Sequence, residues 1–72
     1  NDTWEIGGIA DYPNCTIEVL NRWGNVVFSS KGYASPWDGR WNGELVPVGM
    51  YYYQIYLREV DHKFTGSLSV IR

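Results

Sequence analysis

A single cysteine is the feature that most constrains what this chain can fold into. A domain of 72 residues buries only about 60% of the surface that its unfolded chain exposes, so domains of this size often add disulfides or a metal. Cys15 has no second cysteine to pair with, and His62 is the single histidine, so the chain offers neither a disulfide nor a Cys/His zinc cluster. Aromatic residues, which make up 17% of the chain, are therefore expected to fill the core.

Alternation of apolar and polar residues predicts strands rather than helices. No long window keeps the 3.6-residue period of a helix. The longest predicted strand covers residues 50–60, another covers 64–72, and residues 3–6 are a candidate short edge strand. One face of the longest strand carries Tyr51, Tyr53, Ile55 and Leu57. Short strands separated by turns, about five to seven in number, predict a β-sandwich or a partial barrel.

A β-hairpin is predicted around the dipeptide Gly24-Asn25. Alternating strands flank this dipeptide, and a two-residue Gly-Asn loop is typical of a type II′ turn. This register places Trp23 opposite Val26, so Trp23 is expected to be buried with the other apolar residues of one face. Asn21 lies on the same face and is expected to bond to backbone groups near the turn.

The stretch ASPWDGRWNG, residues 34–43, contains too many turn-forming residues for a helix or a regular strand. In a predicted turn at Asp38-Gly39, the carboxylate can accept a backbone N–H two residues later, and glycine tolerates a positive φ. Trp37 and Trp41 flank this turn and are expected to pack inward onto the core. The alternatives are a surface presented to a partner protein and an aromatic platform that binds sugars.

Enzymatic chemistry is not predicted. His62 falls in a polar connection at residues 60–63 and is expected to be exposed rather than catalytic. Cys15 is expected to be a small, partly buried residue rather than a nucleophile. A small domain of short strands rarely offers the cleft that paired catalytic acids need, and the chain has no phosphate-binding or calcium-binding loop. The sequence therefore predicts no enzyme, no cofactor and no metal site.

Charge and hydropathy argue against nucleic acids and membranes as partners. The net charge is −2, and the basic residues are scattered rather than clustered, which argues against nucleic acid and anionic membrane surfaces. No apolar run approaches the length of a membrane span.

Five segments occur in the order and spacing of a known family. They are NDTWEI, YPNCTIEVLNRWGNVVF, GYASPWDGRWNG, VPVGMYYYQI and FTGSLSVIR. Together they resemble the gliding-motility-associated C-terminal domain, the type B sorting domain of the type IX secretion system in Bacteroidota. The motif residues to which the resemblance assigns a structural or recognition role are Asn21, Arg22, Trp23, Gly24, Trp37, Asp38, Gly39, Gly49, Tyr51, Tyr53, Gly66 and Arg72.

The resemblance implies both a fold and a function. The implied fold is a small immunoglobulin-like β-sandwich of about six or seven short antiparallel strands without a helix, in one domain over residues 1–72. The implied function is that of a C-terminal secretion signal, which directs a large, covalently attached passenger through the periplasm and outer membrane to the cell surface or medium. The implied partners are the type IX translocon and a cognate outer-membrane protein.

One departure from the family pattern concerns the start of the chain. The family usually begins with a PNGDGxND segment, of which only Asn1-Asp2 is present, so the usual first segment is expected to be missing. Two other functions remain open from the residues alone. A β-sandwich rich in Trp and Tyr also suits a carbohydrate-binding module or an adhesive immunoglobulin-like module.

Overall fold

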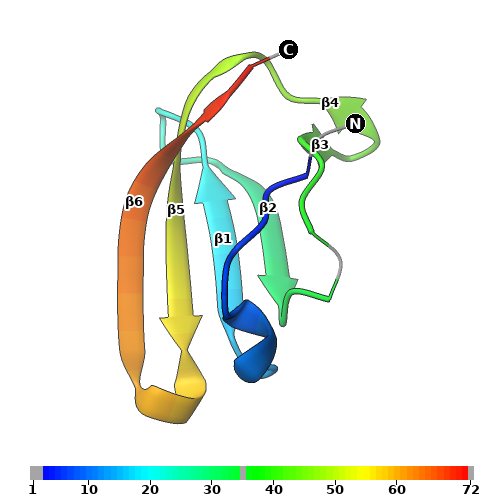
Figure 1. The fold of residues 1–72 in the computed structure, drawn as a ribbon. Coiled ribbons are helices and arrows are strands. Elements are labelled where there is room, and N and C mark those ends of the chain that lie inside the picture. Colours follow the sequence, from blue (N-terminus) through cyan, green and yellow to red (C-terminus); the bar gives the residue numbers. More distant parts are fainter. Residues whose placement is uncertain (1–2, 35, 72) are drawn as a thin grey trace.

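The fold consists of two antiparallel sheets, and the computed structural model describes residues 3–34 and 36–71 of it. The elements in chain order are the 3-10 turn η1 (Ile9–Asp11), β1 (Thr16–Leu20), β2 (Val26–Lys31), β3 (Arg40–Trp41), β4 (Glu44–Leu45), β5 (Gly49–Leu57), the 3-10 turn η2 (Arg58–Val60) and β6 (His62–Val70). Strands β2-β1-β5-β6 form the larger sheet and β3-β4 the smaller (Figure 1). The all-β prediction is confirmed, and no described helix is long enough to cross a bilayer.

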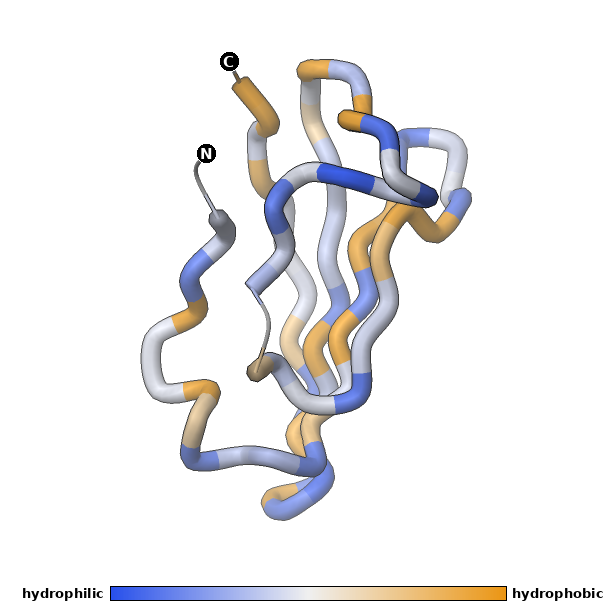
Figure 2. The backbone as a smooth tube through the Cα atoms, turned by 90° about the vertical axis from the view of Figure 1, so that its right-hand side faces the viewer, coloured by the Kyte–Doolittle hydropathy of each residue, from blue (hydrophilic) through white to orange (hydrophobic). Residues whose placement is uncertain are grey.

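The core lies between the larger sheet and a layer of less regular chain. This second layer contains the N-terminal segment, the loop from β2 to β3, and the β3-β4 hairpin. Figure 2 shows the N-terminal segment to one side of the sheet strands, along which apolar residues recur. The buried core residues are Cys15, Ile17, Val19, Trp37, Val46, Tyr51, Ile55 and Leu57. They form a small sandwich-like core in which half-buried aromatic rings fill the space around the aliphatic residues.

The predicted inner face of the longest strand is confirmed. Successive side chains of a strand point to opposite faces, so the odd-numbered residues of β5 share one face. Of these, Tyr51, Ile55 and Leu57 are buried and Tyr53 is half-buried. In the neighbouring strand β1, the fully buried Ile17 lies opposite Ile55.

The connection between β5 and β6 differs from the prediction. The strand expected at residues 50–60 ends at Leu57, because Arg58–Val60 form a 3-10 turn and Asp61 adopts a left-handed φ of 51°. The chain therefore reverses within residues 58–61, and β6 already begins at His62. His62 is exposed, as expected, but it belongs to a strand rather than to the connection.

The β1-β2 hairpin is present, but its loop is longer than the predicted two residues. Leu20 lies opposite Val26, which leaves residues 21–25 in the loop, and the register shifts at a bulge between Val19 and Leu20. The predicted pairing of Trp23 with Val26 is therefore wrong.

The side chain of Asn21 explains this longer loop. Its Oδ1 accepts the backbone N–H groups of Trp23 at 3.0 Å and of Asn25 at 2.9 Å, and its own N–H donates to the carbonyl of Asn25. Asparagine offers the backbone such local partners in competition with strand pairing. The expected bonding of Asn21 to nearby backbone is confirmed, and it ends the strand before Trp23.

Residues 3–6 do not form the predicted edge strand. A backbone hydrogen bond joins this segment to the loop from β2 to β3, from the N–H of Trp4 to the carbonyl of Trp37 at 2.8 Å. The segment is held mainly by side chains, because the half-buried ring of Trp4 packs against the rings of Tyr33 and Tyr53.

The β3-β4 hairpin turns at Asn42-Gly43, whose φ values of 56° and 83° suit a tight primed turn. The dipeptide Asn-Gly is typical of such a turn. Trp41 pairs with Glu44 across the hairpin rather than with the larger sheet, and its side chain is 40% exposed. The expectation that Trp41 packs inward is therefore wrong.

Gly66 leaves room for an aromatic ring close to the backbone of β6. It pairs with Tyr53, and a Cβ at this position would collide with the phenol ring of Tyr53. Gly66→Ala is expected to lower the free energy of unfolding by about 1–3 kcal/mol, because the ring must move. Gly7→Ala is the control, since Gly7 has open space around it and should change stability by less than about 0.5 kcal/mol. Urea denaturation measures both, and equal effects would contradict this role for Gly66.

Candidate functional site

The hydroxyl of Tyr33 holds the loop that carries Trp37, Asp38 and Gly39. It donates to the carbonyl of Trp4 at 2.6 Å and accepts the backbone N–H of Trp37 at 2.8 Å. Partial burial raises the pKa of this hydroxyl above its ordinary value, and the hydrogen bond from Trp37 opposes that shift. One phenol group thus connects the N-terminal segment to the loop.

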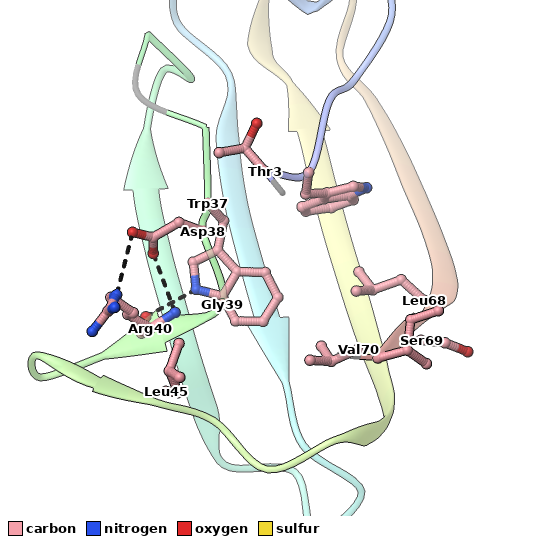
Figure 3. A pocket seen from close by; sticks show the side chains of 11 residues that line it. Thr3, Trp37, Asp38, Gly39, Arg40, Leu45, Leu68, Ser69 and Val70 are labelled. Carbon is pink, nitrogen blue, oxygen red and sulfur yellow. Dashed lines mark hydrogen bonds and ion pairs between the residues drawn. The ribbon is translucent and has the colours of Figure 1, made fainter. Parts of the chain in front are cut away.

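Trp37 packs inward, as predicted. Its side chain is only 4% exposed, and its indole N–H donates to the carbonyl of Arg40 at 2.9 Å (Figure 3). The ring lies against Phe28 and Tyr51, with centroid separations of 5.8 and 6.2 Å. This indole belongs to the core, so a sugar-binding platform that includes its face is not formed.

Asp38 closes its own turn, also as predicted. Its Oδ1 accepts the backbone N–H of Arg40 at 3.2 Å, and Oδ2 lies 3.8 Å from Arg40 Nε. Both side chains are about half exposed, so solvent screens the ion pair and the turn geometry is the main role of the carboxylate. Gly39 supplies the left-handed φ of 82° that this turn needs.

A groove lies between this loop and β6, and we call it the β6 groove. It has a volume of about 560 Å³, and its lining includes Trp4, Trp37, Leu45, Leu68 and Val70 (Figure 3). The charged residues Asp38 and Arg40 at its side interact with each other. Within residues 3–34 and 36–71 there is no group of three or more His, Cys, Asp or Glu that could hold a metal ion. The groove thus presents mainly apolar side chains to whatever occupies it.

The loop between β1 and β2 presents the other candidate site, which we call the Arg22–Trp23 tip. Trp23 is 71% exposed, and the guanidinium carbon of Arg22 lies 4.5 Å from the centroid of its ring. The hydrogen bonds of Asn21 and the left-handed φ of 84° at Gly24 fix the loop around the two side chains. The predicted burial of Trp23 is wrong, because the loop carries the ring beyond the end of the sheet.

The motif residues therefore do not form one site. Asn21 to Gly24 make the tip, Trp37 to Gly39 make the loop beside the β6 groove, and the remaining described ones support β5 and β6. Gly49 begins β5 with a φ of 146°, and the hydroxyl of Tyr51 donates to the carbonyl of Pro47 at 2.6 Å. Arg72 lies outside the described residues.

Sequence reasoning missed the roles of Tyr33 and Trp4. Their hydrogen bond joins residues 29 positions apart, and neither residue falls in a predicted strand with a neighbour that would reveal the contact. The sequence offers one general indication, which is its richness in tyrosine. A tyrosine that becomes half-buried usually finds a hydrogen-bond partner for its hydroxyl.

Two tryptophan substitutions should separate the core from the tip. Trp37→Ala should cost about 3–5 kcal/mol, as deletions of large buried aromatic residues do, and leave the domain largely unfolded. Trp23→Ala removes an exposed ring and should cost less than about 1 kcal/mol. Thermal melts followed by circular dichroism measure both, and a large loss of stability in Trp23→Ala would contradict the exposed position of this ring.

Tyr33→Phe should test the bridging hydroxyl. Loss of the phenol removes a partner from two backbone groups, so the variant should be less stable by about 1–3 kcal/mol at neutral pH. Because folding raises the pKa of Tyr33, its contribution is complete below the ordinary value of 10.0 and is lost as pH rises through the folded-state pKa.

The alkaline part of the stability profile should therefore be shallower in Tyr33→Phe than in the unchanged protein. Tyr56→Phe is the matched control, because the hydroxyl of Tyr56 donates to Asp61 at the surface. That variant should lose less stability at neutral pH than Tyr33→Phe. Equal losses of stability of the two variants, measured by urea denaturation at neutral pH, would show that the hydroxyl of Tyr33 stabilises the fold no more than a surface hydroxyl does.

Comparison with solved structures gives a relative of the same fold. It is PorZ, described as an essential bacterial surface component of the type IX secretion system of Porphyromonas gingivalis. The likeness has a TM-score of 0.68 at 19% sequence identity, and it covers 82% of this chain but only 8% of that one. At this identity the likeness shows the fold alone, and this chain corresponds to a small part of the PorZ structure.

Comparison with curated proteins finds no match. Comparison with protein families matches the CHU_C type IX secretion signal domain over residues 1–70. The match spans the Arg22–Trp23 tip, the loop of Trp37 and all six strands, so it covers the whole fold described above. The chain belongs to the CHU_C type IX secretion signal domain family.

Proposed function

We propose that this domain directs an attached passenger protein through the type IX translocon to the cell surface or medium. Membership of the secretion signal family over residues 1–70 is the observation that carries the proposal. The described side chains agree with a recognition role, since the Arg22–Trp23 tip exposes an apolar ring beside a cation and the β6 groove is lined mainly by apolar side chains. The domain would act by binding, without turnover.

The proposed contact for the translocon and a cognate outer-membrane protein is the Arg22–Trp23 tip. Tryptophan and arginine are enriched among the residues that dominate protein interfaces. Trp23 is the most exposed of the four tryptophans, whereas Trp37 is buried and Trp4 is half-buried. A partner that covers this ring would gain most of its apolar surface as contact area.

The order of the tip also favours a binding role. Binding costs less when the contact residues are already held in one arrangement. The side chain of Asn21 holds two N–H groups of this loop, and Arg22 stacks over the ring of Trp23. A fixed Trp–Arg pair can present an apolar face and a cation to the same partner surface.

An export assay tests this function. A reporter with a signal peptide is fused in front of the domain and produced in a bacterium that has a type IX system. The fusion should reach the surface or medium, and it should remain inside cells of a translocon-deficient strain. Equal export from both strains would show that the domain is not a type IX signal.

The same assay tests the tip. Trp23→Ala should reduce export at least about tenfold, the change that a loss of 1.4 kcal/mol in binding would cause. Trp41→Ala is the matched control, because Trp41 is also exposed but lies on the β3-β4 hairpin, and its export should stay normal. Circular dichroism checks that both variants are folded. Normal export of a folded Trp23→Ala variant would remove the tip from the proposal without affecting the signal function.

A further inference from the structure

The guanidinium of Arg22 has no acidic partner in the part of the chain that the structure describes. It is exposed and lies over the ring of Trp23, whereas the ion pair found among the described residues joins Arg40 to Asp38. A guanidinium carries five N–H donors in one plane. Stacking on a ring uses the face of that plane, so the donors at its edge stay free for a second group.

The backbone of the tip offers no competing donors at residues 23–25. The N–H groups of Trp23 and Asn25 donate to Oδ1 of Asn21, and the N–H of Gly24 donates to the carbonyl of Asn21 at 3.0 Å. Backbone N–H groups that point outward can form a nest for an anion, but these three are used inside the loop. An anion at the tip would therefore be bound by the guanidinium of Arg22.

Among the described residues, Arg22 also carries the only charge at its end of the larger sheet. Strand β1 ends and β2 begins there, and β5 begins and β6 ends beside them, because neighbouring strands are antiparallel (Figure 1). Residues 19–30 contain no charged side chain except Arg22, and residues 45–57 and 64–71 contain none. The opposite end carries both signs within residues 58–63. A chain with a net charge of −2 thus presents an uncompensated cation at the tip.

The side chains at this end of the sheet are otherwise apolar and open to a partner. Trp23, Val26, Val48 and Met50 are exposed, and they lie in the tip or at the beginning of β2 and β5. Anionic bilayers attract clusters of basic residues, so one arginine among apolar side chains suits a protein surface better than a lipid surface. The partner that fits this end is a protein with an apolar surface and one anionic group.

We propose that Arg22 pairs with a carboxylate of the protein that receives this domain, within an apolar surface that covers Trp23. The inference rests on the proposed secretion function and names the chemistry of the partner at the tip. A guanidinium and a carboxylate match in geometry and form two parallel N–H···O bonds. Arg22 also determines specificity, because a partner surface without an anion would leave the guanidinium covered and unpaired.

Three substitutions at this one position test the charge in the export assay. Arg22→Lys keeps the charge but loses the bidentate geometry, Arg22→Gln removes the charge, and Arg22→Glu reverses it. Export should fall in this order, by about tenfold in Arg22→Gln and by at least about a hundredfold in Arg22→Glu, which places like charges opposite each other. Arg58→Glu is the matched control, since it changes the net charge equally at the exposed turn η2 and should be exported normally.

Two outcomes of this series overturn the inference, provided that circular dichroism shows folded variants. Equal export of Arg22→Lys and Arg22→Gln would show that the partner does not read the charge. Export of Arg22→Glu at the level of Arg58→Glu would show that no anion faces the tip. Both are judged against the unchanged fusion, whose dependence on the translocon tests the signal function separately.

Carbodiimide cross-linking tests whether the anion is a protein carboxylate. The reagent activates a carboxylate, a lysine amine attacks it to form an amide, and the carbodiimide leaves as a urea. In cells that export the Arg22→Lys fusion, the new amine should become joined to an aspartate or glutamate of another protein, which mass spectrometry of the joined peptides identifies. Arg58→Lys adds an amine at the opposite end of the sheet and should not give this product.

The cross-linking result also separates a protein carboxylate from other anions. If the Arg22→Lys fusion is exported and its new amine joins no carboxylate of another protein, the anion belongs to a different class, such as a lipid-linked phosphate. That result would overturn the inference while leaving the signal function in place.

Discussion

One phenol hydroxyl joins the N-terminal segment to the loop before β3 in the second layer. The larger sheet is held by continuous strand pairing, but the N-terminal segment and the loop before β3 have no such ladder. The hydroxyl of Tyr33 bonds to a backbone group of each, at Trp4 and at Trp37. The core residues beneath stay buried only while this layer covers them. A domain of this size buries a smaller share of its surface than a larger one, so it depends more on each buried group. Because this hydroxyl holds the backbone at Trp37, it also positions the turn at Asp38 and the side of the β6 groove that this loop forms.

Aromatic packing replaces the disulfide or metal that small domains often use. The rings of Trp4, Tyr33, Phe28, Trp37 and Tyr51 make successive contacts at centroid separations of 5.8 to 6.2 Å. Large rings bury much area for each ordered residue, so a few of them can close a sandwich whose second layer has only four strand residues. Of the four tryptophans, the two that lie outside this series, Trp23 and Trp41, are exposed.

Features governed by neighbouring residues could be predicted from the sequence. The inner face of β5 follows from alternation, and the turn at Asp38 follows from a carboxylate that bonds two residues onward. The burial of Trp23 was predicted wrongly because the side chain of Asn21 competed with strand pairing and lengthened the loop. The bridge from Tyr33 to Trp4 was beyond prediction, since it depends on how two irregular segments meet in space.

The burial of Cys15 has a consequence for the passenger that such a domain would accompany. Proteins exported from the cell meet oxidising conditions, in which reactive thiols exchange with disulfides. The thiol of Cys15 is fully buried, and this burial raises its pKa, so little of it exists as the nucleophilic thiolate. A folded signal domain can therefore travel with a disulfide-forming passenger without mispairing. Folding before oxidation would thus protect such a cargo from exchange with this thiol.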